Sequence, residues 1–201
     1  MRNRPYPWND QVPLPEDFPA FFAFIEQAYG ERNAFAYERE KERVEVSFAQ
    51  FVTDVYALAA SFRAADRQGQ RYALLSENRY EWILFFFAGI LAGGVAVPID
   101  KDLPPEEIQT RLTQVQAQIL VYSPEYADIA ENLAVPQKIN MKQLPELLAL
   151  GAQAGFSRDA LVPDPDAAAV IFFTSGTTGK SKGAMYSSGS LLFVAWAGIS
   201  T

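Results

Sequence analysis

The sequence contains neither cysteine nor histidine. The absence of cysteine excludes disulfide bonds, a thiolate nucleophile and cysteine-ligated metal sites. The absence of histidine excludes a Ser–His–Asp triad and histidine-ligated zinc. Any catalysis by this chain must therefore rely on positioning and electrostatics, or on carboxylates and lysines.

Positive charge is also sparse. The formal net charge is −7, and the lysines and arginines do not gather into runs. Nucleic-acid binding requires a clustered basic surface that neutralises phosphates. We therefore expect no nucleic-acid partner.

The uncharged stretch 82–99 is the one segment whose length would permit a membrane span. Glycines and Pro98 interrupt it, and they favour a buried helix over 81–91, then a turn and a buried strand over 95–98. Residues 1–8 lack the apolar core of a signal peptide. We expect a cytoplasmic protein, with peripheral attachment at the membrane as the alternative.

Helical and extended patterns alternate along the chain, whose composition of 49% hydrophobic and 20% charged residues is typical of a folded domain. Helices are predicted at 16–29, 48–65, 81–91, 104–115, 125–132 and 144–150, and strands at 35–37, 43–47, 72–75, 95–98, 119–122, 137–140 and 168–173. The first two strands are expected to pair as a hairpin. The alternation of the rest predicts an α/β fold, with a mostly parallel sheet flanked by helices.

The predicted organisation has three parts. Residues 1–15 form an N-terminal arm, residues 16–150 an α/β sheet subdomain, and residues 151–201 a linker, one strand with its loop, and the start of a helix. Glycine, proline and aspartate mark the boundary over 151–166. The apolar segment 191–196 should be buried against something, and the chain ends soon after it. We therefore expect a truncated polypeptide that could self-associate through this apolar end.

The most informative feature is a run of small polar residues after the predicted strand 168–173. It reads Thr174-Ser175-Gly176-Thr177-Thr178-Gly179-Lys180-Ser181-Lys182. The two glycines allow the backbone to approach a ligand closely. Hydroxyl groups and backbone N–H groups can form an anion-binding nest, and the lysines supply positive charge. The run therefore predicts a polyphosphate-binding loop.

Two other interpretations fit less well. A Walker A loop places four residues between its glycines and opens into a helix. Here Gly176 and Gly179 enclose only Thr177 and Thr178, and residues 182–186 have an extended pattern. A Ser/Gly-rich linker would not follow the strand-like run 170–173.

The run resembles, position for position, the phosphate loop of the adenylate-forming superfamily, which includes acyl-CoA synthetases, luciferases and peptide-synthetase adenylation domains. Ser181 stands where proline is commoner, and Lys182-Gly183 matches the end of the family motif. Residues 72–82 look like a segment of long-chain fatty acyl-CoA synthetases, and residues 93–99 and 118–123 look like family strands. The resemblance implies the fold of the N-terminal subdomain of adenylate-forming enzymes.

The resemblance also implies a two-step ligase. A carboxylate attacks ATP to give an acyl-adenylate, and a thiol, coenzyme A or that of a carrier protein, then takes the acyl group. The implied phosphate-binding residues are Thr174, Ser175, Gly176, Thr177, Thr178, Gly179, Lys180 and Lys182. Lys182 would offset leaving-group charge. Lys180 falls at the family's variable position, where a solvated surface lysine is favoured and phosphate binding is the alternative. ATP, Mg²⁺, coenzyme A and a carboxylic acid, in particular a fatty acid, are the implied ligands. Tyr186, Phe193 and Trp196 could line a pocket for the acyl group, but core packing is the favoured explanation for these residues.

The sequence departs from the family pattern after the loop. Ser187, Ser188 and Ser190 stand where members carry a Thr-His pair and then an asparagine. The segments for adenine, magnesium and ribose, and the C-terminal domain with its catalytic lysine, are not found, so we assign no catalytic residue and no metal ligand within this chain. We expect it to be inactive without the missing C-terminal portion. The alternative is a free-standing, non-catalytic fragment that binds a partner through its apolar C-terminal end.

Overall fold

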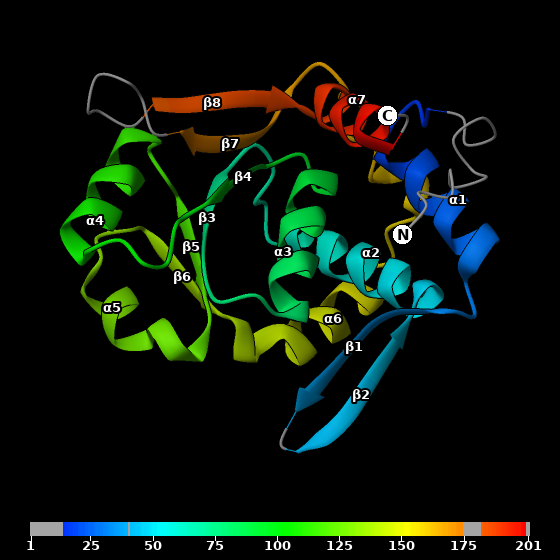
Figure 1. The fold of residues 1–201 in the computed structure, drawn as a ribbon, viewed down its shortest axis with the longest axis horizontal. Helices are drawn as coiled ribbons and strands as arrows, with labels where there is room; N and C mark the ends of the chain where they lie inside the picture. The colour runs from blue at the N-terminus through cyan, green and yellow to red at the C-terminus, as the bar shows by residue number, and fades with distance from the viewer. Residues whose placement is uncertain (1–13, 40, 175–181, 200–201) are drawn as a thin grey trace, which may run out of the picture.

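The computed structural model describes residues 14–39, 41–174 and 182–199. A six-stranded sheet with the strand order β6-β5-β3-β4-β7-β8 forms its centre (Figure 1). The strands are β3 (Arg71–Leu75), β4 (Val95–Pro98), β5 (Ile119–Tyr122), β6 (Gln137–Asn140), β7 (Ala168–Thr174) and β8 (Lys182–Ser187). Neighbouring strands are parallel except for β8, which pairs antiparallel with β7. This confirms the predicted α/β class with a mostly parallel sheet.

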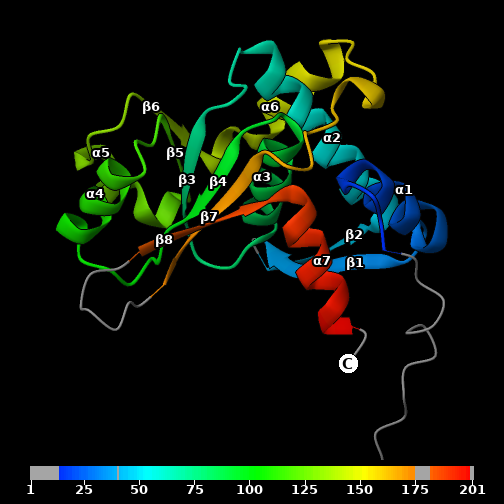
Figure 2. The same ribbon diagram turned by 90° about the horizontal axis from the view of Figure 1, so that it is seen from above.

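Helices cover both faces of the sheet (Figure 2). The helices α4 (Pro105–Gln114) and α5 (Ala127–Asn132) cover one face, and α2 (Phe48–Ala64), α3 (Tyr80–Leu91) and α6 (Leu144–Gln153) lie on the other. The helix α1 (Phe18–Tyr29) packs against α2, and α7 (Ser188–Ile199) follows β8. Two hydrophobic clusters result, one for each face of the sheet.

Side-chain caps begin α1 and α2 close to the predicted positions. The Asp17 carboxylate accepts a hydrogen bond of 2.7 Å from the backbone N–H of Ala20. The Ser47 hydroxyl accepts one of 3.2 Å from the N–H of Gln50. Each cap satisfies a backbone donor that the first helical turn leaves without a partner.

The uncharged stretch 82–99 is divided between α3 and β4, as predicted. Leu84, Phe85 and Ile90 of α3 are buried in the larger cluster. Among the described residues, no helix has the length and apolar character needed to cross a membrane.

The prediction that α6 ends at residue 150 is wrong. The helix continues through Gln153, and Gly151 is buried inside it. A Cβ atom at Gly151 would lie 1.7 Å from the carbonyl oxygen of Ala57, so the glycine permits α6 to cross closely over α2. The sequence pattern suggested a turn, but this glycine serves close packing.

The predicted hairpin is confirmed as β1 (Asn33–Arg39) and β2 (Glu42–Ser47), an antiparallel pair that projects from the body (Figure 1). Its aromatic residues join it to the core. The ring of Phe35 lies 5.1 Å from that of Phe51 and 5.3 Å from that of Tyr80, centroid to centroid. The ring of Tyr37 stacks on Tyr80 at 5.8 Å.

Candidate functional site

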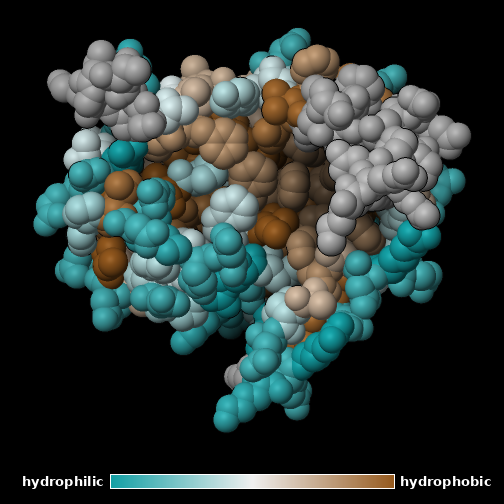
Figure 3. All heavy atoms as spheres, in the orientation of Figure 1, coloured by the Kyte–Doolittle hydropathy of each residue, from teal (hydrophilic) through white to brown (hydrophobic). Residues whose placement is uncertain are grey.

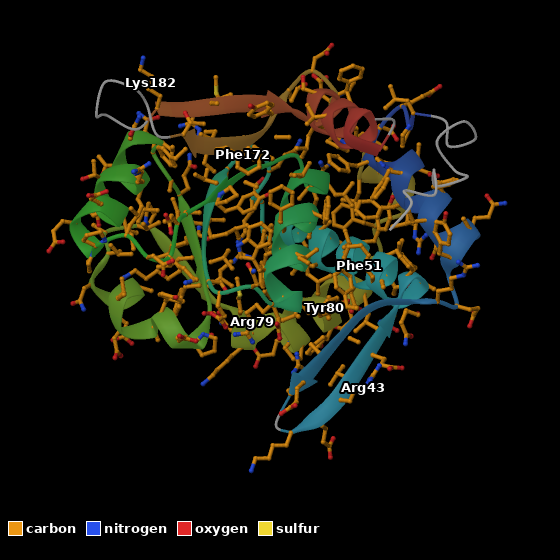
Figure 4. All side chains as sticks on the ribbon, in the orientation of Figure 1. Arg43, Phe51, Arg79, Tyr80, Phe172 and Lys182 are labelled. Carbon is orange, nitrogen blue, oxygen red and sulfur yellow. The ribbon has the colours of Figure 1, made fainter. Side chains whose placement is uncertain are left out.

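The antiparallel strands β7 and β8 hold the two described ends of the candidate phosphate loop. Thr174 and Lys182 face each other across the pair, and the Thr174 hydroxyl donates a hydrogen bond of 3.4 Å to the Lys182 carbonyl oxygen. Both residues are exposed, and Lys182 lies at the start of β8 (Figure 4). The other predicted phosphate-binding residues, which connect these ends, lie outside the described residues: Ser175, Gly176, Thr177, Thr178, Gly179 and Lys180.

The segment after the loop is a strand, as predicted. In a Walker A site the loop opens into a helix whose N-terminus faces the phosphates. Here β8 runs back along β7 from Lys182 to Ser187, and α7 begins only at Ser188. This geometry agrees with the rejection of Walker chemistry from the motif spacing.

Next to the loop, the β7–β8 pair contains an aromatic ring, that of Phe173. Phe173 of β7 faces Gly183 of β8, and a Cβ atom at Gly183 would lie 3.9 Å from Cε1 of that ring. The same Cβ would lie 2.9 Å from Cγ2 of Ile171, so a side chain at Gly183 would force a shift. The guanidinium carbon of Arg111, on α4, lies 4.6 Å from the centre of the Phe173 ring. Arg111 could not be identified from the sequence, because nothing near it in the sequence indicates a contact with β7.

The serines at the junction of β8 and α7 have a structural role. The Ser187 hydroxyl accepts a hydrogen bond of 3.2 Å from the backbone N–H of Ser190, which is the geometry of a helix cap. Ser188 is buried, and its hydroxyl donates a hydrogen bond of 3.3 Å to the carbonyl oxygen of Asp164. These residues begin α7 and attach it to the preceding linker.

A second polar cluster lies at the carboxyl ends of β3 and β5, where the strand order reverses and α/β proteins often bind ligands. The Glu77 carboxylate accepts hydrogen bonds from the hydroxyls of Ser123 and Ser76 and pairs with Arg79 at 2.9 Å. Burial alone would raise the pKa of Glu77, but the hydrogen bond from Ser123 and the charge of Arg79 hold it below its usual value. Both carboxylate oxygens of Glu77 thus have partners within the protein, which favours a structural role for Glu77 over ligand binding.

The same network ties the β1–β2 hairpin to α3. Glu81 is buried and accepts hydrogen bonds of 2.8 Å from Arg79 and 2.6 Å from Arg39 of β1 (Figure 4 labels Arg79 and Tyr80). Burial alone would raise the pKa of Glu81, but the two arginines keep it below its usual value. Within the described part of the chain, no group of His, Cys, Asp and Glu side chains could hold a metal ion.

Glu81→Gln is expected to lower the free energy of unfolding at pH 7 by about 2 kcal/mol, less than for a fully buried pair because Arg39 is half exposed. The folded pKa of Glu81 is depressed, so its stabilisation is present above the ordinary value of 4.5 and is lost as the pH falls through the folded value. Urea denaturation from pH 7 to pH 3 should therefore show the two stability curves converging at acid pH.

A suitable control is Glu45→Gln, because Glu45 pairs with Arg43 on the exposed hairpin surface. That change should leave stability almost unaltered across the same range. The assigned role of the buried carboxylate would be contradicted if the difference in free energy of unfolding between Glu81→Gln and the unsubstituted chain stayed constant down to pH 3.

The apolar residues considered for an acyl pocket or for core packing have different environments. Tyr186 is half-buried and meets Phe172 edge-to-face at 5.9 Å. Phe193 is 55% exposed, so the expectation that it packs in the core of this chain is wrong. The reason is that α7 presents Leu192 to the core and turns Phe193 outward. The side chain of Trp196 lies outside the described residues.

The mostly parallel sheet with the antiparallel edge strand β8 is the fold of the N-terminal subdomains of adenylate-forming enzymes. Residues 24–200 match the AMP-binding enzyme family, and the chain belongs to this family.

Among curated proteins, the chain is 30% identical over 198 residues to a mitochondrial medium-chain acyl-CoA ligase of Danio rerio, covering 80% of this chain and 32% of that protein. It is 32% identical over 151 residues to a feruloyl-CoA synthase of an Amycolatopsis species, covering 73% of this chain and 29% of that protein. The chain thus spans about a third of the length of these relatives.

Solved structures show the same fold. The N-terminal subdomain of NpsA from Klebsiella oxytoca matches with a TM-score of 0.71 at 22% identity, covering 90% of this chain and 43% of that chain. A fatty acyl CoA synthetase of Mycobacterium tuberculosis matches with a TM-score of 0.70 at 22% identity, covering 86% of this chain and 34% of that chain. The recognition of the superfamily from the sequence is confirmed.

Proposed function

We propose that this chain is the N-terminal part of an ATP-dependent acyl-CoA synthetase and that its β7–β8 hairpin presents the loop that holds the β- and γ-phosphates of ATP. One observation carries the proposal. Thr174 and Lys182, the two ends of the motif, are paired in register at the open end of two antiparallel strands. The residues between them in the sequence are rich in hydroxyls and glycine, a composition that is suited to binding an anion through hydroxyl and backbone N–H donors.

Within this proposal, the carboxylate of the acyl substrate attacks the α-phosphate of ATP. The bond from the α-phosphorus to the bridging oxygen of pyrophosphate breaks, and an acyl-adenylate forms. A thiol then attacks the acyl carbon, and AMP leaves. The exposed ammonium of Lys182 would offset the charge that develops on the leaving pyrophosphate. The Thr174 hydroxyl would exchange its long hydrogen bond to the Lys182 carbonyl for one donated to a phosphate oxygen.

Magnesium and coenzyme A complete the proposed set of ligands. No residue of the described part of the chain is proposed as a ligand of Mg²⁺, which would neutralise phosphate charge when bound with ATP. Coenzyme A is proposed as the thiol because both relatives described above are named as coenzyme A ligases or synthases. Their names differ in the acid, so the proposal is limited to a carboxylic acid.

The apolar surface beside the hairpin supports the proposal that more polypeptide belongs on this chain. Hydrophobic side chains gather in a hollow between the β7–β8 pair and α3 (Figure 3). The partly buried hydrophobic residues packed against the larger cluster include Trp82, Phe87, Phe172 and Leu191. We propose that the remaining portion of the ligase covers this surface.

The test is carboxylate-dependent exchange of labelled pyrophosphate into ATP by the product of the whole reading frame. A panel of medium- and long-chain fatty acids and aromatic acids is offered, and the 201-residue chain serves as the control. We expect exchange with at least one acid for the whole product and none for the chain alone. Exchange by the 201-residue chain alone would contradict the proposal that it needs the rest of the ligase. A longer product that shows no exchange with any acid would contradict the ligase assignment.

A second candidate rests on the exposure of Phe193 and Val194, which are 55% and 57% exposed on α7. If the reading frame ends at codon 201, the native product would be a non-catalytic fragment that binds a partner, or a second copy of itself, through this apolar helix. Sequencing the gene beyond that codon separates the two proposals.

A further inference from the structure

We propose that β2, the outer strand of the β1–β2 hairpin, is the surface through which two copies of this chain associate. Within the described residues the hairpin is a separate two-stranded sheet, so β2 pairs with β1 alone. Figure 1 shows β2 along the outer margin of the molecule, with β1 on the side of α3. One edge of β2 therefore presents backbone N–H and C=O groups that a further strand can bind.

Contacts with α3 hold the hairpin in place and leave this edge open. The rings of Phe35 and Tyr37 pack on the ring of Tyr80. The Arg39 guanidinium pairs with the buried Glu81 carboxylate at 2.6 Å. These contacts come from β1, so they fix the hairpin without covering the outer edge of β2. A strand that is already fixed loses little conformational entropy when it pairs with another.

The side chains of β2 alternate between its two faces. Val44 and Val46 pack on the larger hydrophobic cluster. Arg43 and Glu45 lie on the opposite face, with their side chains 75% and 43% exposed, and their charged groups are 2.7 Å apart. A positive and a negative side chain therefore stand at equal spacing on either side of Val44.

This order of charges is complementary to itself. When two β2 strands pair antiparallel about a twofold axis at Val44, Arg43 of each copy lies opposite Glu45 of the other. Each arginine then has a glutamate beside it on its own strand and a second one across the new pair, and like charges are only diagonal neighbours. Opposite charges directly across a strand pair attract each other, so a second copy of this chain is a partner whose charges fit.

The other face of the same pair is apolar. Val44 would meet Val44 of the second copy, and within each hairpin Tyr37 of β1 already stands opposite Val44. The result is a four-stranded antiparallel sheet with valine and tyrosine on one face and alternating charges on the other. One pair of six-residue strands buries less than the roughly 800 Å² per partner of a standard interface, so the dimer should be weak and reversible.

The test is sedimentation equilibrium of the 201-residue chain at rising concentration. Arg43→Glu and Glu45→Arg each place like charges opposite one another, so each should raise the dissociation constant of the dimer about tenfold or more. An equimolar mixture of the two variants should associate again, because the two glutamates of one then face the two arginines of the other. Circular dichroism checks that each variant is folded.

Two controls separate this dimer from association through the apolar surface of α7. Lys142→Glu makes the same change in net charge at an exposed residue outside the hairpin and should leave the dissociation constant unchanged. Sodium chloride at about 1 M screens exposed ion pairs, so it should weaken association of the unsubstituted chain.

Three results would each overturn the proposal: no association of the unsubstituted chain, association that neither charge reversal weakens, or failure of the two folded variants to associate when mixed. If a variant does not fold, association that salt fails to weaken would do the same. Each of these results would leave the proposed ligase role intact.

Discussion

Gly89→Ala is expected to destabilise the fold by about 3 kcal/mol or more, although alanine is the better helix former. Gly89 lies in α3 against the fully buried Tyr72 of β3, and a Cβ atom at this position would lie 1.9 Å from Cζ of the tyrosine ring. The helix α3 cannot move away from β3 to make room, because it is packed between the sheet and α2. Guanidinium denaturation followed by circular dichroism would measure the loss.

A compensating change tests the assigned cause. Tyr72→Leu removes the ring atoms that the new methyl group would meet, so Gly89→Ala/Tyr72→Leu should be more stable than Gly89→Ala alone, by about 2 kcal/mol. Gly155→Ala is the control. Gly155 has a φ of 71° and no atom within 4 Å of a new Cβ, so this change should cost only about 1 kcal/mol of backbone strain. A double variant no more stable than Gly89→Ala would show that the Tyr72 ring is not the obstacle.

Lys182→Ala is expected to lower carboxylate-dependent pyrophosphate exchange by the whole ligase about a hundredfold. The reason is that its ammonium would stabilise charge that grows on the leaving pyrophosphate in the transition state, where no other group described here on the hairpin is cationic. Lys182→Arg keeps the charge and should recover a large part of the rate. The measurement is the exchange rate at saturating ATP and acid, with the Michaelis constant for ATP determined separately.

The neighbouring lysine provides a matched comparison. Lys180→Ala removes the same charge two residues earlier, at a position that varies in the family pattern, and should change the rate by no more than about threefold. If Lys182→Ala and Lys180→Ala lose equal activity, the loss is caused by the lower net charge of the loop, and the specific role proposed for Lys182 is wrong.

Local signals were sufficient for most of the fold. The strands 95–98, 119–122 and 137–140 were predicted to the residue, because short apolar or extended runs stand between helices and turn-forming residues. The candidate loop was visible for a similar reason, since its glycines, hydroxyls and lysines are contiguous. Its ends, Thr174 and Lys182, are brought together by strand pairing; the extended pattern after the loop predicted a strand, but not its pairing with β7.

Contacts between distant segments could not be predicted in the same way. Gly151 looked like a turn residue, and only its approach to Ala57 shows that it belongs to a helix crossing. Arg111 and Glu81 are ordinary helix residues by their local pattern, and their partners Phe173 and Arg39 lie far away in the sequence. The side chain of Phe193 was expected in the core because it is apolar, but the rotation of α7 decides which of its residues face inward.

The central claim, that the β7–β8 hairpin presents a polyphosphate-binding loop, is tested most directly by titrating the ¹⁵N-labelled chain with tripolyphosphate and following backbone amide shifts. The account predicts saturable shifts confined to Thr174, Lys182 and the residues that connect them. Shifts centred on Ser76, Glu77 and Ser123, or no saturable shift at millimolar tripolyphosphate, would contradict it.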